Sequence, residues 1–155
     1  MGIMNGYEPK KVLEFFEQVC AVPHGSGNTK AISDYLVRFA EERGLRYTQD
    51  AENDVIIVKE ASEGYENAET VILQGHIDMV CEKTADSQHD FKKDGLKLHF
   101  DGEWLSAEDT TLGGDNGIAV AMMMGTPAVS ARVRSFFKME IPSSPGSMIS
   151  RTISS

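Results

Sequence analysis

Residues 70–80 constrain the fold more than any other stretch of this chain. They begin with an uninterrupted apolar run, residues 71–73, and continue through Gly75 to His76 and Asp78. A short continuous apolar run predicts a strand that is buried on both faces of a sheet. A histidine at the end of such a strand can bind a metal through one ring nitrogen, while its other N–H needs an acceptor that fixes the tautomer. Asp78 is close enough in sequence to be that acceptor.

The His-x-Asp pattern is weak on its own, because most such pairs are a capping aspartate beside a surface histidine. It gains weight from residues 110–117, a glycine-rich turn that contains Asp115 and directly precedes an apolar, helix-like run. A glycine-rich turn before a helix also suits a phosphate group. The Asp115 carboxylate would repel phosphate, so we interpret the turn as a cation site.

The two segments together resemble the M20 family of zinc peptidases, and within it the aminoacyl-histidine dipeptidases. The resemblance lies in residues 73–83 (LQGHIDMVCEK) and 110–118 (TTLGGDNGI), with residues 23–28 (PHGSGN) near the start, and it covers about residues 8–124. It implies an α/β fold, namely the N-terminal portion of a zinc-peptidase (phosphorylase/hydrolase-like) catalytic domain with helices packed on a mixed sheet.

The resemblance also implies a site and a reaction. In the family, two zinc ions are bridged by an aspartate and a water, and the substrates are dipeptides. His76 matches the histidine ligand of one zinc, Asp78 matches the catalytic-site aspartate that orients this histidine, and Asp115 matches the bridging carboxylate. Two zinc ions lower the pKa of the shared water and polarise the scissile carbonyl. A cis peptide bond is implied between Asp115 and Asn116, and a trans bond would indicate that the metal-site geometry is lost.

Other parts of the family's site have no counterpart in this sequence. The family needs a Glu-Glu pair after the bridging aspartate, another carboxylate ligand and a late histidine. Here the only acid after Asp115 is Glu140, and no histidine follows His99. We therefore predict weak zinc binding, because affinity falls with each missing donor, and we predict that the chain is a truncated dipeptidase, inactive alone.

Two alternatives remain open. The chain could be a non-catalytic binding or interaction module that retains the first lobe of the fold and a vestigial metal site. It could also be a complete small hydrolase with another base, but the candidate loop residues Glu82, His89 and Glu108 have no supporting pattern.

The chain changes character near residue 125. Residues 126–155 contain eight serines, three prolines, four basic residues and one acidic residue. We predict a partial M20-like catalytic domain over residues 8–124 and a non-homologous Ser/Pro-containing tail over residues 125–155, which is either out of frame or disordered. The tail is expected not to continue the central sheet. The alternative is a strand at residues 135–141 on the sheet edge.

Periodicity and turn signals predict the remaining elements. Helices are expected from Pro9 onward and over residues 29–43 with Asn28 as the cap, strands at 46–49 and 55–58, a hairpin around Asp101-Gly102, and a helix over 118–124 that is buried on every face. The histidines His24 and His99 and the pair Glu41-Glu42 are interpreted as non-ligand residues.

Composition excludes some functions. The formal net charge of −9 argues against nucleic-acid partners, and no run approaches the roughly 20 apolar residues of a membrane span. The two cysteines, Cys20 and Cys81, are predicted to be reduced thiols of a cytoplasmic protein. The sequence carries no signal of oligomeric state.

Overall fold

The computed structural model describes residues 2–126 and 133–138. Its elements in chain order are α1 (Lys10–Cys20), α2 (Lys30–Glu42), β1 (Arg46–Gln49), β2 (Val55–Lys59), β3 (Val71–His76), β4 (Leu98–Phe100), β5 (Leu105–Ala107), α3 (Gly114–Gly125) and β6 (Val133–Lys138). The first two predicted helices and the first two predicted strands are confirmed within one or two residues at their ends, whereas α3 begins four residues before the predicted helix over residues 118–124.

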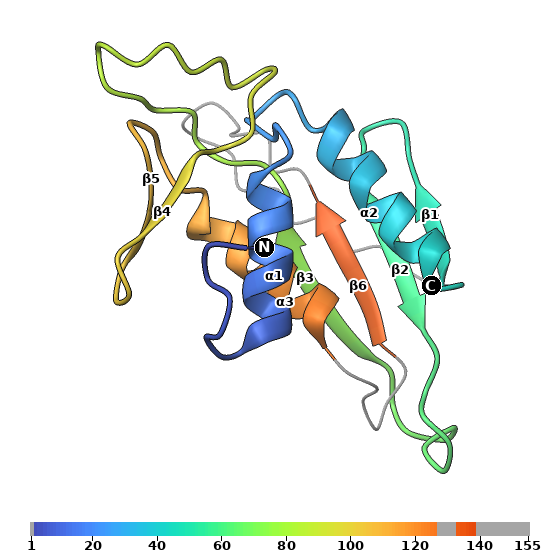
Figure 1. Ribbon diagram of the computed structural model, residues 1–155. Coiled ribbons are helices and arrows are strands. Elements are labelled where there is room, and N and C mark those ends of the chain that lie inside the picture. The colour runs from blue at the N-terminus through green and yellow to red at the C-terminus, as the bar shows by residue number, and fades with distance from the viewer. Residues whose placement is uncertain (1, 127–132, 139–155) are drawn as a thin grey trace, which may run out of the picture.

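The larger sheet of the structure is mixed and has four strands in the order β1-β2-β6-β3 (Figure 1). β1 and β2 are antiparallel, β6 is antiparallel to β2, and β6 is parallel to β3. The predicted α/β class with helices on a mixed sheet is therefore confirmed. Because β3 is at one end of this order, its second edge has no strand partner among the described residues.

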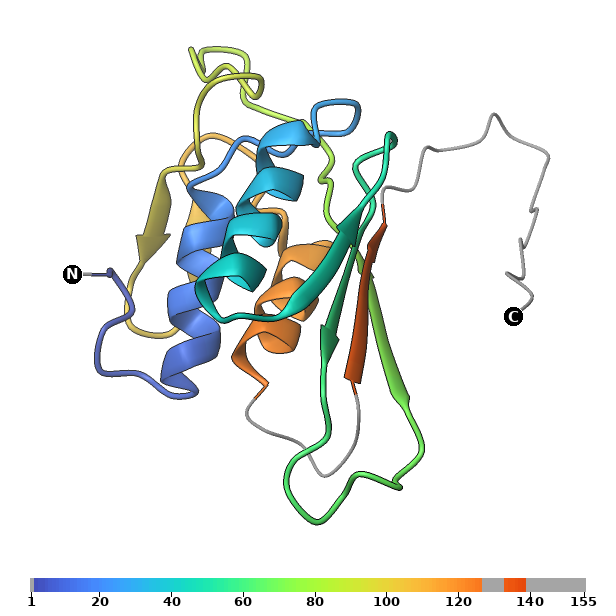
Figure 2. The same cartoon turned by 90° about the vertical axis from the view of Figure 1, so that its right-hand side faces the viewer.

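The three helices lie on the same face of this sheet, whereas no described helix covers the opposite face (Figure 2). The core fills the space between helices and sheet, and its fully buried members include Val19 of α1, Ile32 and Leu36 of α2, Val55 of β2 and Val120 of α3. The amphipathic pattern of α1 and α2 explains this arrangement, since each helix directs one apolar stripe toward the sheet.

The predicted hairpin is confirmed as β4 and β5, with Gly102 in its turn at φ +102°. It packs on the outer side of α1 and α3 through Leu98, Phe100 and Leu105, which contact a second buried cluster that includes Phe16 and Cys20. His99 is exposed on β4, as the alternation of the strand predicts.

The prediction that β3 is buried on both faces is wrong. Val71 is 45% exposed and Ile72 is 60% exposed. Both strand position and layer order explain the difference, because β3 lies at the sheet edge and one face of the sheet has no helix over it in the described chain. The strand also continues through Gly75 and ends at His76.

The prediction that the tail leaves the sheet is wrong for residues 133–138. They form β6, which lies between β2 and β3. The alternative prediction, a strand on the edge of the sheet, is therefore also wrong in its position. A strand with a partner on each side forms backbone hydrogen bonds along both edges, and these do not depend on a period-two side-chain pattern. Residues 127–132 and 139–155, to which the rest of this prediction applies, are outside the described residues.

Two local predictions also need correction. Thr29, not Asn28, occupies the N-cap of α2, and the Asn28 amide instead donates to the Lys92 carbonyl at 3.3 Å. In α3, Ile118 is 39% exposed and Met122 is 57% exposed, so this helix is not buried on every face. Its apolar surface exceeds what α1 and the sheet can cover.

None of the helices within the described ranges has both the length and the apolar character that crossing a bilayer requires.

The two cysteines are unpaired and differ in accessibility. Cys20 is buried, and burial together with the nearby Glu17 carboxylate raises the pKa of its thiol to about 12. Cys81 is exposed, although partial burial also raises its thiol pKa. Since the thiolate is the reactive form, we expect a disulfide reagent at pH 8 to label only Cys81 in the folded chain. Cys81→Ser should remove this labelling, and labelling of Cys20 before unfolding would contradict the expectation.

Candidate metal site

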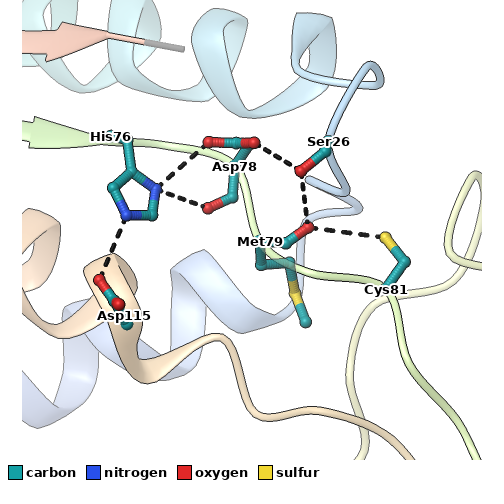
Figure 3. A network of polar contacts seen from close by, with 6 residues as sticks. All are labelled: Ser26, His76, Asp78, Met79, Cys81 and Asp115. Atoms are coloured by element: carbon teal, nitrogen blue, oxygen red, sulfur yellow. Dashed lines mark hydrogen bonds and ion pairs between the residues drawn. The ribbon is translucent and has the colours of Figure 1, made fainter. Parts of the chain in front are cut away.

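The His76 side chain lies between two aspartates that come from different parts of the chain (Figure 3). Its Nε2 atom is 3.2 Å from Asp115 Oδ1, although the two residues are 39 positions apart. The predicted convergence of His76 and Asp115 is therefore confirmed. His76 is the last residue of β3, and Asp115 lies beside it at the start of α3.

Asp78 occupies the other side of the imidazole ring. The His76 Nδ1 atom is 3.0 Å from the Asp78 carbonyl oxygen and 3.2 Å from Asp78 Oδ1. Two acceptors at Nδ1 favour the tautomer that carries its proton there. Asp78 is only 7% exposed, so water has little access to the carboxylate. This arrangement leaves the Nε2 lone pair directed toward Asp115.

The loop that carries Asp115 approaches the chain after β3 closely. A side chain at Gly113 would place its Cβ 3.0 Å from the Met79 sulfur, and Gly113 also has a φ of +68°, so glycine suits both the space and the backbone here. Asp115 and Asn116 depart from helical dihedral angles. The peptide bond between them is cis, as the resemblance implies.

The chemistry of these donors fits a divalent cation. A neutral imidazole with its proton on Nδ1 presents a lone pair to the Asp115 carboxylate, and two electron-rich atoms at this distance need a proton or a cation between them. Zinc ligands lie about 2.0–2.2 Å from the metal in a tetrahedron, which separates two ligand atoms by about 3.4 Å. The observed 3.2 Å between Nε2 and Oδ1 is close to that value. Within the part of the chain that the structure describes, no group of three or more His, Cys, Asp or Glu side chains could hold a metal ion.

Sequence reasoning gave no role to Ser26, yet this residue belongs to the site. Its hydroxyl donates to Asp78 Oδ2 at 2.6 Å. The only signal was its place in residues 23–28, one of the segments that carry the family resemblance. The contact joins residues 52 positions apart, and a spacing of this size has no local periodicity that could reveal it.

The other titratable residues considered from the sequence do not join His76. His24 is buried, its Nδ1 lies 2.6 Å from the Val22 carbonyl oxygen, and burial lowers its pKa. His89 packs its ring edge-on against Phe91, with centroids 4.5 Å apart. Glu82 and Glu108 are exposed loop residues. The pair Glu41-Glu42 is exposed at the end of α2, as the sequence predicts.

Known proteins are similar to this chain in sequence and in fold. No family model matches the chain. The chain is 38% identical over 128 residues to the cytosol non-specific dipeptidase of Escherichia coli (strain K12), a match that covers 83% of this chain and 26% of the relative. The crystal structure of aminoacylhistidine dipeptidase from Vibrio alginolyticus matches with a TM-score of 0.83 at 35% identity, over 90% of this chain and 29% of that one. Over most of its length the chain is therefore similar to dipeptidases.

The fold of this chain also resembles more distant structures. Aminopeptidase PepT from Bacillus cereus ATCC 10987 matches with a TM-score of 0.65 at 13% identity, over 84% of this chain and 36% of that one. At this identity the likeness concerns the fold alone. The chain spans about a quarter of the length of its E. coli relative, with 26% of that protein covered.

Proposed function

We propose that this chain provides one part of the metal centre of a dipeptidase, with His76 and Asp115 as metal ligands and Asp78 as the residue that orients His76. The observation that supports this most directly is the 3.2 Å contact between His76 Nε2 and Asp115 Oδ1. The similarity to dipeptidases supports the reaction class, hydrolysis of a peptide bond in a short peptide. Aminoacyl-histidine dipeptides are the proposed substrates, and the cytosol is the proposed location.

Each residue has a distinct part in this proposal. Asp78 accepts a hydrogen bond from the Nδ1–H of His76 and so keeps the Nε2 lone pair available for a metal. Asp115 presents a carboxylate with a 93% exposed side chain, which leaves the site open to solvent and substrate. A bound zinc ion would supply Lewis-acid chemistry, polarising a peptide carbonyl and lowering the pKa of a bound water.

Among the described residues no group of three or more His, Cys, Asp or Glu side chains could hold a metal ion, and the proposal is that the general base and the remaining ligands are not among these residues. A site with two protein donors cannot complete a tetrahedron, and we therefore expect weak zinc binding by the chain alone. Without a general base beside the water, we expect no dipeptide hydrolysis by the chain alone.

A second candidate function is a non-catalytic interaction module. Val71 and Ile72 are exposed on β3, and the second edge of β3 has no strand partner in the part of the chain that the structure describes, which favours this function. An apolar strand with an unpaired edge can pair with another polypeptide. In this case the His76–Asp115 pair would be vestigial, and partner binding would not depend on metal.

Calorimetric titration with zinc and an assay with an aminoacyl-histidine dipeptide test the proposal on the purified chain. We expect weak zinc binding that His76→Ala and Asp115→Ala each remove, and no hydrolysis above the buffer rate. Tight binding of two zinc equivalents, or hydrolysis by the chain alone, would contradict the partial site. Zinc binding that survives both substitutions would reject the ligand assignment and leave the interaction module as the better explanation.

A further inference from the structure

The Asp78 carboxylate has two oxygen atoms, and each has its own partner in the structure (Figure 3). Oδ1 faces the His76 Nδ1 atom at 3.2 Å, whereas Oδ2 accepts the Ser26 hydroxyl at 2.6 Å. A carboxylate can rotate about its terminal torsion, which is broad and roughly two-fold. A short hydrogen bond to one oxygen limits this rotation and therefore fixes where the other oxygen lies.

Ser26 is held in place by the backbone on either side of it. The Ser26 N–H donates to the Met79 carbonyl at 3.0 Å, and the Met79 N–H donates to the His24 carbonyl at 3.0 Å. These two bonds join the loop before α2 to the chain immediately after Asp78. Gly25 permits this close approach, because a Cβ at this position would lie 2.3 Å from the Cys81 sulfur.

The Ser26 hydroxyl has one proton and two acceptors in reach. The Met79 carbonyl oxygen is 3.2 Å away and already accepts the Ser26 N–H, whereas Asp78 Oδ2 is 2.6 Å away and carries charge. Charge-assisted O–H···O⁻ bonds are typically 2.5–2.7 Å long and are stronger than neutral ones. The proton therefore belongs to the bond with Asp78.

We propose that Ser26 is a positioning residue of the metal site: its hydroxyl orients the Asp78 carboxylate, which in turn fixes the tautomer and the orientation of His76. The inference rests on the ligand role of His76 described under the proposed function. The proposal adds one hydrogen bond to the site, the bond between Ser26 and Asp78. Through Asp78, this bond connects His76 to the loop before α2, which has no ligand pattern in the sequence.

The test compares three variants of the whole chain. Ser26→Ala removes the hydroxyl, and Ser26→Thr retains it. Ser87→Ala is the control, because it removes a hydroxyl from a loop outside the site; the Ser87 oxygen accepts the backbone N–H of His89 at a distance of 3.3 Å. Long-range ¹H–¹⁵N NMR at about pH 9, where histidine is ordinarily neutral, measures the tautomer of His76 without any metal. Cobalt(II) titration, followed through its visible absorption, measures metal affinity.

We expect Ser26→Ala to increase the Nε2–H tautomer of His76 and to weaken cobalt affinity by about 10-fold, at the lower end of the loss seen for outer-shell partners. Ser26→Thr should restore both readouts, and Ser87→Ala should match the unmodified chain. An unchanged tautomer and unchanged affinity in a folded Ser26→Ala chain would overturn the role of Ser26. If the unmodified chain binds no cobalt, the proposed function fails, but the NMR readout still decides the role of Ser26.

Discussion

Replacement of His76 by alanine is expected to lower zinc affinity by more than about 100-fold, a larger loss than the 10–100-fold typical of outer-shell changes. His76 supplies one of only two donors that the described chain places together. Asp115 alone is an exposed carboxylate with no partner ligand, and such a group binds zinc no better than other surface acids do. Asp78→Asn should have a smaller effect, because it leaves both donors in place and alters only the orientation of one.

The matched control is His99→Ala, since His99 is an exposed histidine on β4 away from the site. Zinc titration calorimetry at pH 7.5 with equal protein concentrations compares these three variants, and also His24→Ala and His89→Ala. Equal losses for His76→Ala and His99→Ala would indicate non-specific binding to surface histidines. A loss confined to His24→Ala or His89→Ala would place the metal elsewhere.

The second large effect concerns stability. Proline at position 135 is expected to destabilise the chain by about 3 kcal/mol or more, the scale of a proline that breaks a regular element. Ser135 is in the middle of β6, opposite Ile57 of β2 and Leu73 of β3. Proline has no N–H to donate, and sheets tolerate it only at edges and bulges.

Ser135→Thr provides the control for Ser135→Pro, because threonine keeps the N–H and suits a strand. Urea unfolding, followed by far-ultraviolet circular dichroism, gives the free energy of unfolding for each variant. Folded domains are stable by about 5–15 kcal/mol, so the expected loss is readily measurable. Equal midpoints for the proline variant and the unmodified chain would mean that β6 does not contribute to the sheet.

Amphipathic periodicity was sufficient to predict α1 and α2. Phe16 and Val19 of α1, and Ile32 and Leu36 of α2, are all buried as the spacing of apolar residues predicts. This works because a helix repeats its inner face every three to four residues, so the pattern is complete within the element itself.

The strand arrangement could not be predicted in the same way. β6 reads VRSFFK, which lacks clean alternation, and its place between β2 and β3 depends on partners that are distant in sequence. The exposure of Ile72 also depends on distant parts of the chain. An apolar run indicates that a strand is favoured, but it does not indicate which layers cover that strand. Strand order is a property of the assembled sheet.

The site was predictable only in part. The motifs indicated His76, Asp78 and Asp115, and the structure brings all three together. Their roles as metal ligands and orienting residue remain predictions. Ser26 was missed because its contact with Asp78 depends on how the loop after α1 folds back on the chain after β3, and this is a tertiary contact.

The strand order β1-β2-β6-β3 has a consequence for synthesis on the ribosome. β2 can pair with β1 as soon as both emerge, but β3 ends at residue 76 and its neighbour β6 begins only at residue 133. At a translation rate of about 5–20 residues per second, this delay is on the order of 3–10 seconds. During this delay both edges of β3, the strand that carries His76, are exposed, and its sequence VILQGH is uncharged. Such a segment is open to pairing with other nascent chains, so the yield of folded protein should depend on translation speed and on chaperones that shield residues 71–76.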